Sequence, residues 1–160
     1  MPAEYPPVRK EIVVEAPPER AFRVFTDRFD QWWPREHHIG QAPLARAVLE
    51  PGVGGRFYEI GTDGSECNWG KVLVWEPPRR LVIAWQLNPE WTYDPNLITE
   101  LELRFTAVGP LQTKVELEHR NMERFGEKAV ATREGLASEQ GWGGLLLLYA
   151  KEAAEEKTHA

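Results

Sequence analysis

The residues best suited to chemistry in this chain are its four histidines and its single cysteine. His37 and His38 are adjacent and follow Glu36. Metal ligands lie about four residues apart on one helical face, or two apart on one strand face. Adjacent histidines in extended chain point to opposite sides. We therefore expect no metal site, and we interpret His37 and His38 as structural residues or as polar groups at the mouth of a pocket.

Cys67 and His119 are the other two candidates. Cys67 has no second cysteine to pair with, and no spacing rule connects it to His119 as a base, so we expect it to pack as a small hydrophobic residue. Alternation in the strand around residues 114–119 places Val115, Leu117 and His119 on one apolar face. His119 is therefore either a hydrogen-bonded core histidine or a polar anchor in a cavity.

The chain contains seven tryptophans, and their spacing is informative. Trp69 and Trp75 lie an even number of residues apart in one expected strand, so they share a face. Such a set of rings forms either a packed aromatic core or the walls of an apolar pocket with few polar groups. We predict a pocket with tryptophan walls and histidine anchors. Its residues would be Trp33, His38, Trp69, Trp85, His119 and Trp142.

These residues must be positioned by helices and strands, and prolines and glycines in the sequence mark where those elements end. A β-rich segment over residues 8–15 ends at two prolines, and Phe22, Phe25, Phe29 and Trp33 then form a helical stripe. A break near residues 27–30 would divide this stripe into two short helices. About six strands follow, over residues 47–49, 56–60, 67–76, 81–87, 99–105 and 114–119. A short helix over residues 127–137 precedes a longer one that Ser138 can cap.

This order predicts an α+β fold, in which a curved antiparallel sheet of about six to seven strands wraps around a long C-terminal helix. We expect one domain over residues 1–160, with a core from about 8 to 155. The net charge of −6 disfavours nucleic-acid binding. The apolar stretch 145–150 is too short to span a membrane. No signal-peptide pattern is present, so we expect a cytoplasmic protein.

Several segments resemble the START-like, or SRPBCC, superfamily. Residues 12–22 are similar to its first strand and helix. Within the superfamily, the match is to the branch named for the C-terminal domain of the activator of the 90-kDa heat-shock chaperone's ATPase. The matching segments are 53–57, 70–73, 75–81 and 141–142, and the resemblance covers about residues 8–155. It implies a helix-grip fold that encloses a cavity. The superfamily includes lipid carriers, hormone receptors, polyketide cyclases and co-chaperone domains.

From the resemblance and the tryptophans we expect the protein to bind a small hydrophobic or aromatic molecule between the sheet and the C-terminal helix. We expect no cofactor. Two alternatives remain open. A cyclase or hydratase would use the same cavity, with His119 as the group that moves a proton. A protein-interaction module that regulates a chaperone would instead present an exposed apolar patch, and a protein partner or a homodimer would then be expected.

Overall fold

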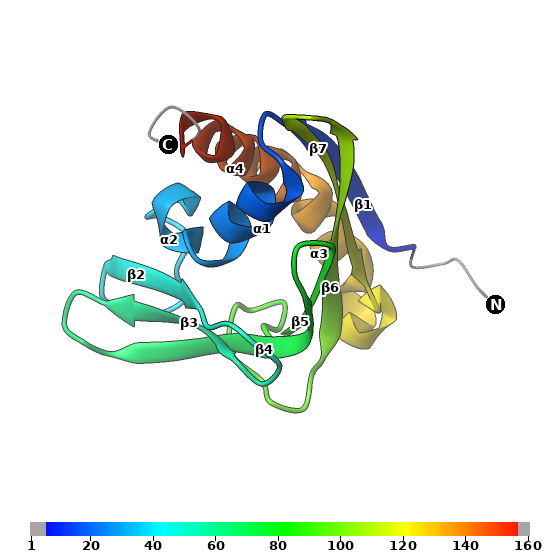
Figure 1. Ribbon diagram of the computed structural model, residues 1–160. Coiled ribbons are helices and arrows are strands. Elements are labelled where there is room, and N and C mark those ends of the chain that lie inside the picture. Colours follow the sequence, from blue (N-terminus) through cyan, green and yellow to red (C-terminus); the bar gives the residue numbers. More distant parts are fainter. Residues whose placement is uncertain (1–5, 157–160) are drawn as a thin grey trace.

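The computed structural model describes residues 6–156 and contains one seven-stranded antiparallel sheet in the order β1-β7-β6-β5-β4-β3-β2. In Figure 1, β2 to β4 and the group β6, β7 and β1 form two walls that meet at a bend, so the sheet is strongly curved. The strands are β1 (Val8–Val14), β2 (Leu44–Leu49), β3 (Arg56–Gly61), β4 (Glu66–Glu76), β5 (Arg80–Trp85), β6 (Thr99–Gly109) and β7 (Gln112–Arg120).

The concave side of the sheet is occupied by helices (Figure 1). The helical elements are α1 (Pro18–Thr26), α2 (Phe29–Trp32), the 3-10 helix η1 (Met122–Lys128), α3 (Ala129–Ala137) and α4 (Trp142–Glu156). The curved sheet around a long C-terminal helix, with two short helices after the first strand, confirms the predicted helix-grip fold. Among the described residues, none of the helices has the length and apolar character required to cross a bilayer.

Helix α1 forms where the sequence indicates. Pro18 occupies its first turn, where a missing N–H costs nothing, and Phe22 and Phe25 are buried on its inner face. The helix ends at Thr26, and the chain resumes as α2 at Phe29, which confirms the predicted break.

The long helix α4 is fixed to α1 and the sheet by buried contacts. Tyr149 is fully buried, its ring lies 5.3 Å from that of Phe25, and its hydroxyl donates a 2.6 Å hydrogen bond to the carbonyl of Ala21. Burial raises the pKa of this hydroxyl far above its usual range, so the hydroxyl stays protonated and continues to donate. Helix α4 is therefore held firmly against α1.

The outer face of the sheet carries an ion-pair cluster centred on Glu102. Its side chain is only 2% exposed, because the guanidinium groups of Arg80, Arg104 and Arg120 surround it at 2.6–2.8 Å. Burial alone would raise the pKa of Glu102, but the three arginine hydrogen bonds outweigh it and lower the pKa to about 2. The carboxylate thus points outward, as the alternation predicts, but it is covered by its own partners.

Candidate ligand-binding pocket

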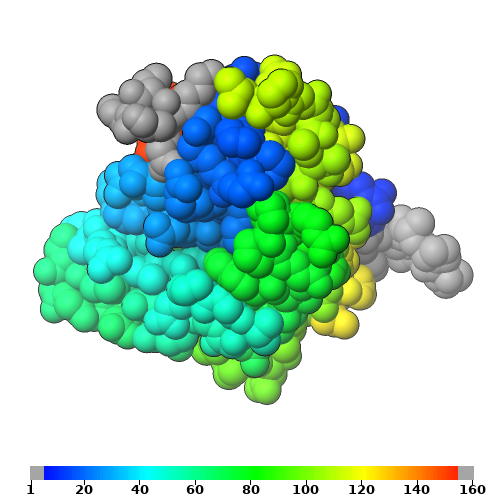
Figure 2. Space-filling model, in the orientation of Figure 1, coloured from blue at the N-terminus to red at the C-terminus, as the bar shows by residue number. Residues whose placement is uncertain are grey.

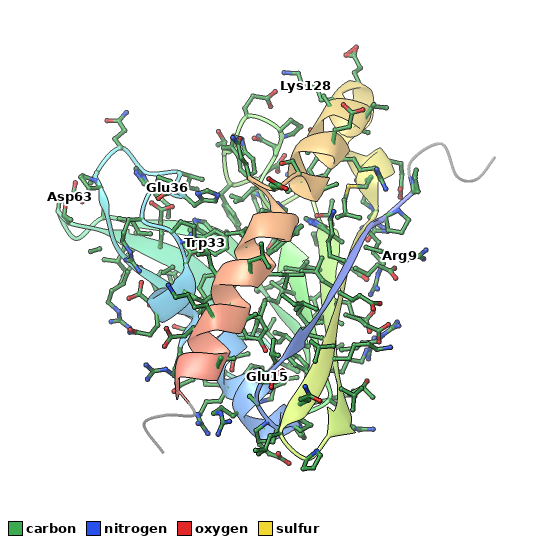
Figure 3. All side chains as sticks on the ribbon, turned by 90° about the horizontal axis from the view of Figure 1, so that it is seen from above. Arg9, Glu15, Trp33, Glu36, Asp63 and Lys128 are labelled. Atoms are coloured by element: carbon green, nitrogen blue, oxygen red, sulfur yellow. The ribbon has the colours of Figure 1, made fainter. Side chains whose placement is uncertain are left out.

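A pocket of about 570 Å³ opens between the segment 33–39, the β5–β6 loop, α3 and the start of α4. Five tryptophans from these elements and from the sheet line it: Trp33, Trp69, Trp85, Trp91 and Trp142. Figure 3 labels three residues of its lining, namely Trp33, Glu36 and Lys128. Of the six residues predicted from the sequence, all except His119 line this pocket.

Four of the tryptophans close the deep end of the pocket and are called the floor here. Their exposed fractions are 6% for Trp33, 2% for Trp69, 4% for Trp85 and 1% for Trp142. The rings pack on one another, with centroids 5.3 Å apart for Trp33 and Trp69 and 5.6 Å apart for Trp85 and Trp142. These four tryptophans therefore belong both to the packed core and to the lining of the pocket.

Helix α3 and the residue before it supply one wall, and this wall is made mostly of small side chains. Lys128, Ala131, Thr132 and Gly135 line the pocket at spacings of three and four, so they share one helical face. A Cβ atom added to Gly135 would meet nothing within 4 Å. The open volume thus exists because this face carries little bulk. The helix was expected from the sequence, but its role as a pocket wall was not; its small residues at helical spacing are the signal that could have indicated it.

The β5–β6 loop lies at the mouth of the pocket. Its Trp91 is 53% exposed and has a φ of 61°, a conformation uncommon for a residue with a side chain. The neighbouring Glu90 forms an ion pair with Lys128, which joins the loop to the N-terminus of α3. Sequence reasoning missed Trp91, because this irregular stretch carries no periodic pattern.

The segment that carries the adjacent histidines is anchored by Glu59 of β3. This carboxylate is 1% exposed and accepts hydrogen bonds from the backbone N–H groups of Ile39 (2.6 Å) and Gly40 (2.9 Å). It also accepts a 2.9 Å hydrogen bond from the indole of Trp69. Glu59 therefore connects the segment to the floor. Sequence reasoning missed it, although alternation in β3 places it on the same face as the buried Phe57.

The two adjacent histidines have different partners. His38 Nδ1 lies 2.8 Å from the carbonyl oxygen of Gly40, and His37 Nε2 lies 3.2 Å from that of Gln140. A carbonyl only accepts, so each of these nitrogens carries a proton and donates it. Over residues 6–156, no group of three or more histidine, cysteine, aspartate or glutamate residues is arranged to hold a metal ion.

His119 lies behind the floor rather than in the pocket, which differs from the prediction. It is fully buried; its Nδ1 accepts a 3.2 Å hydrogen bond from the indole N–H of Trp142, and its Nε2 lies 2.8 Å from Thr99 Oγ1. The hydroxyl of Thr99 in turn donates to the carbonyl of Trp85. Alternation correctly places His119 on the inner face of β7, but Trp142 from α4 covers it. Burial lowers its pKa to about 3, so the imidazole is neutral and carries its proton on Nε2.

Cys67 lies in β4, whereas His119 lies in β7, and β5 and β6 separate the two strands in the sheet. Burial raises the pKa of the Cys67 thiol, and the nearby carboxylates Glu59 and Asp63 raise it further. A raised pKa keeps the sulfur in its unreactive thiol form. The structure thus does not bring Cys67 and His119 together.

A second hollow of about 460 Å³ lies between α1 and the β4–β5 turn and includes Phe22, Trp75 and Pro78 in its lining. Figure 2 shows the segments of α1 and of the β4–β5 turn meeting on this face of the molecule. In its lining, the rings of Phe22 and Trp75 pack edge to face with centroids 5.1 Å apart.

A curved antiparallel sheet that grips a C-terminal helix, with a tryptophan-floored pocket between them, defines a helix-grip protein. The family model described as Activator of Hsp90 ATPase homolog 1-like protein matches residues 15–146, and the chain belongs to this family. The resemblance stated from the sequence is thereby confirmed. A comparison with curated proteins found no match to this chain.

Three solved structures show the range of similar proteins. The anthrahydroquino-γ-pyrone synthase Txn09, complexed with SUM, is 38% identical with a TM-score of 0.66, over 94% of this chain and 99% of that one. CalC from Micromonospora echinospora, a self-sacrificing resistance protein, is 32% identical with a TM-score of 0.72, over 95% and 96% of the two chains. PFC0360w from Plasmodium falciparum, an HSP90 activator, is 22% identical with a TM-score of 0.55, over 86% and 91%, and shows likeness of fold alone.

Proposed function

We propose that this protein binds a small planar aromatic molecule in the pocket between the sheet, α3 and α4. The observation that carries the proposal is the pocket itself, with a volume of about 570 Å³ above a floor of tryptophan rings. Pockets for small molecules are usually of roughly 300–1,000 Å³, mostly apolar, and contain a few polar groups that fix orientation. The pocket meets each of these three conditions.

The distribution of polar groups supports an orientation for the ligand. The floor consists of indole rings, whereas charged and polar side chains also line the pocket, among them Glu36, His38, Lys128 and Gln140. An aromatic ligand would gain most by placing its ring system toward the floor, where edge-to-face contacts with indole rings are favourable. Its hydroxyl, carbonyl or carboxylate groups would then lie near the polar side chains.

The similar proteins support an aromatic ligand rather than a lipid chain. The relative at 38% identity is a synthase of an anthrahydroquino-γ-pyrone, a name that denotes fused aromatic rings. Both this relative and the resistance protein at 32% identity align over more than nine-tenths of the chain, so the pocket elements are included in the match. The HSP90 activator is too distant to support a chaperone role, since it shares the fold alone.

The first test compares the native and the denatured mass of freshly purified protein. A discrete excess in the native state would identify a retained ligand. The second test titrates the protein with 1,8-dihydroxyanthraquinone by calorimetry, using a variant that fills the pocket. Gly135→Leu places bulk on the pocket face of α3, where a new Cβ meets no atom within 4 Å. We expect it to lower affinity at least tenfold, about 1.4 kcal/mol, while the protein stays folded.

Val130→Leu is the matched control, because Val130 lies on the same helix, is 55% exposed and does not line the pocket. We expect this variant to bind like the parent protein. The proposal is overturned if the native and denatured masses agree and the titration shows no binding. It is also overturned if Gly135→Leu and Val130→Leu bind the anthraquinone equally well, because the ligand would then lie elsewhere.

A further inference from the structure

One polar group of the floor has no hydrogen-bond partner among residues 6–156. The indole N–H groups of Trp33, Trp69 and Trp142 donate to His37 O (2.8 Å), Glu59 Oε1 (2.9 Å) and His119 Nδ1 (3.2 Å). No acceptor within residues 6–156 receives a hydrogen bond from the indole N–H of Trp85, although this side chain is only 4% exposed. Its Nε1 is not fully enclosed by protein atoms, and the Trp85 side chain lines the pocket.

An indole N–H in this position is suited to an acceptor on a ligand. Because no protein acceptor among residues 6–156 uses this N–H, an oxygen atom of a ligand placed opposite Trp85 would gain a hydrogen bond from it. Indole nitrogen donates only and does not accept. The group that Trp85 would recognise is therefore a hydrogen-bond acceptor, such as a carbonyl oxygen.

His38 supplies the complementary group. Its Nδ1 donates to the carbonyl of Gly40, so in the neutral ring Nε2 carries a lone pair and can accept a proton. The acceptor Gly40 is itself held by Glu59 through its backbone N–H at 2.9 Å. A base oriented by a hydrogen bond at its other nitrogen is the usual arrangement for an imidazole that removes a proton.

His119 cannot take this role, because both of its ring nitrogens are engaged in the core behind the floor. His37 donates from Nε2 to the carbonyl of the exposed Gln140, whereas the partner of His38, Gly40, is held by the buried Glu59, so His38 is the more firmly oriented of the two. His38 Nε2 has no hydrogen-bond partner among residues 6–156 and belongs to a side chain that lines the pocket.

We infer that the pocket is a proton-transfer site for hydroxyaryl ketones, in which His38 accepts the hydroxyl proton and Trp85 donates a hydrogen bond to the ketone oxygen. The inference rests on the proposed function, because the aromatic body of the substrate must first lie on the floor. The class of reaction is the closure of an oxygen-containing ring by addition of a phenol oxygen to a carbon–carbon double bond conjugated with the ketone.

The step balances without any further reactant. With 2′-hydroxychalcone as probe, the phenol proton passes to His38 Nε2 and the phenol oxygen forms a bond to the β-carbon of the enone. The alkene electron pair moves toward the ketone to give an enolate, whose oxygen accepts the hydrogen bond from Trp85. The protonated imidazole then returns its proton to the α-carbon. The product, flavanone, is an isomer of the probe.

The experiment follows the loss of chalcone absorbance with the complete chain and with four variants. His38→Gln removes the base, and we expect kcat to fall by about 100-fold with little change in KM, since general-base catalysis is worth roughly 10²–10⁴. His38→Ala with added imidazole should recover part of the rate. Trp85→Phe keeps a ring but loses the N–H, and kcat should fall about tenfold or more. Trp75→Phe is the matched control outside the pocket and should leave the rate unchanged.

The outcomes separate this inference from the proposed function. If the protein binds dihydroxyanthraquinone but converts chalcone no faster than the same concentration of free imidazole does, the proton-transfer site is wrong and the binding function stands. Unchanged kcat in His38→Gln, or no rescue of His38→Ala, also overturns the inference. If neither aromatic probe binds and the native and denatured masses agree, the proposed function fails, and this inference fails with it.

Discussion

The buried neutral state of His119 predicts how the stability of the protein depends on pH. Burial lowers the pKa of His119 from an ordinary 6.5 to about 3 in the folded protein. Below pH 6.5 the unfolded chain takes up a proton at this residue, whereas the folded protein does not until about pH 3. The unfolded state therefore binds more protons, and stability falls as the pH falls through this window.

The magnitude follows from the width of the window. One pH unit corresponds to about 1.4 kcal/mol for one proton, so lowering the pH to about 5 should cost about 2 kcal/mol through His119. By about pH 3 the loss should approach 5 kcal/mol, as an order of magnitude. Glu102 affects stability at lower pH. Folding lowers its pKa from 4.5 to about 2, so the stability that its ionised form contributes is lost as the pH falls through that range. Between pH 7 and about 5, the change in stability therefore reports the protonation of His119 and not that of Glu102.

The assay is urea unfolding of the parent protein and of His119→Gln at pH 7, 6 and 5. The variant has no titrating group at this position. Between pH 7 and 5 its free energy of unfolding should therefore fall by about 2 kcal/mol less than that of the parent protein. Its stability at pH 7 should itself be lower by about 1–3 kcal/mol, because the hydrogen bonds to Trp142 and Thr99 are disturbed. Equal pH dependence in the two proteins would refute a buried, neutral His119.

The remaining predictions concern packing around the floor. In Glu59→Gln, the amide nitrogen must face an N–H donor that the carboxylate now binds. We expect the free energy of unfolding in urea to fall by about 1–3 kcal/mol and the amide of Gly40 to exchange hydrogen faster. Unchanged exchange at Gly40 would contradict the anchoring role of Glu59. In Gly70→Ala the new Cβ would lie 1.7 Å from the carbonyl of Ala84, so we expect a loss of more than about 4 kcal/mol or failure to fold. In contrast, Gly135→Ala should leave thermal stability equal or higher, because its Cβ meets open space and alanine favours helix; similar losses in both glycine variants would contradict the packing described.

Much of the fold could be predicted because its signals are local. The spacing of Phe22, Phe25 and Phe29 indicates helix, and two-residue alternation indicates strands whose faces are known in advance. Alternation even places Glu102 and His119 on the correct faces of the sheet. What covers each face depends on residues far away in the chain, and no periodic pattern contains that information.

The same limit explains where the geometry of the site differs from the sequence-based expectation and which lining residues were missed. His119 faces inward, as expected, but whether it meets a cavity depends on where α4 places Trp142, 23 positions further along the chain. Trp91 stands in an irregular loop, and its place at the mouth follows from the packing of that loop on α3. Glu59 was identifiable as an inward-facing acid, but its partners Ile39 and Gly40 lie in a segment without regular structure.

The structure separates a fixed part of the pocket from an adjustable part. The floor is held by hydrogen bonds from Trp69 to Glu59 and from Trp142 to His119, and all four of these side chains are almost completely buried. Another wall carries small side chains of α3, and an exposed ion pair joins the β5–β6 loop to the start of that helix. Exposed ion pairs contribute little to stability, whereas changes in a packed core cost several kcal/mol. Substitutions on α3 should therefore alter which ligands bind without harming the fold, and substitutions in the floor should change both together.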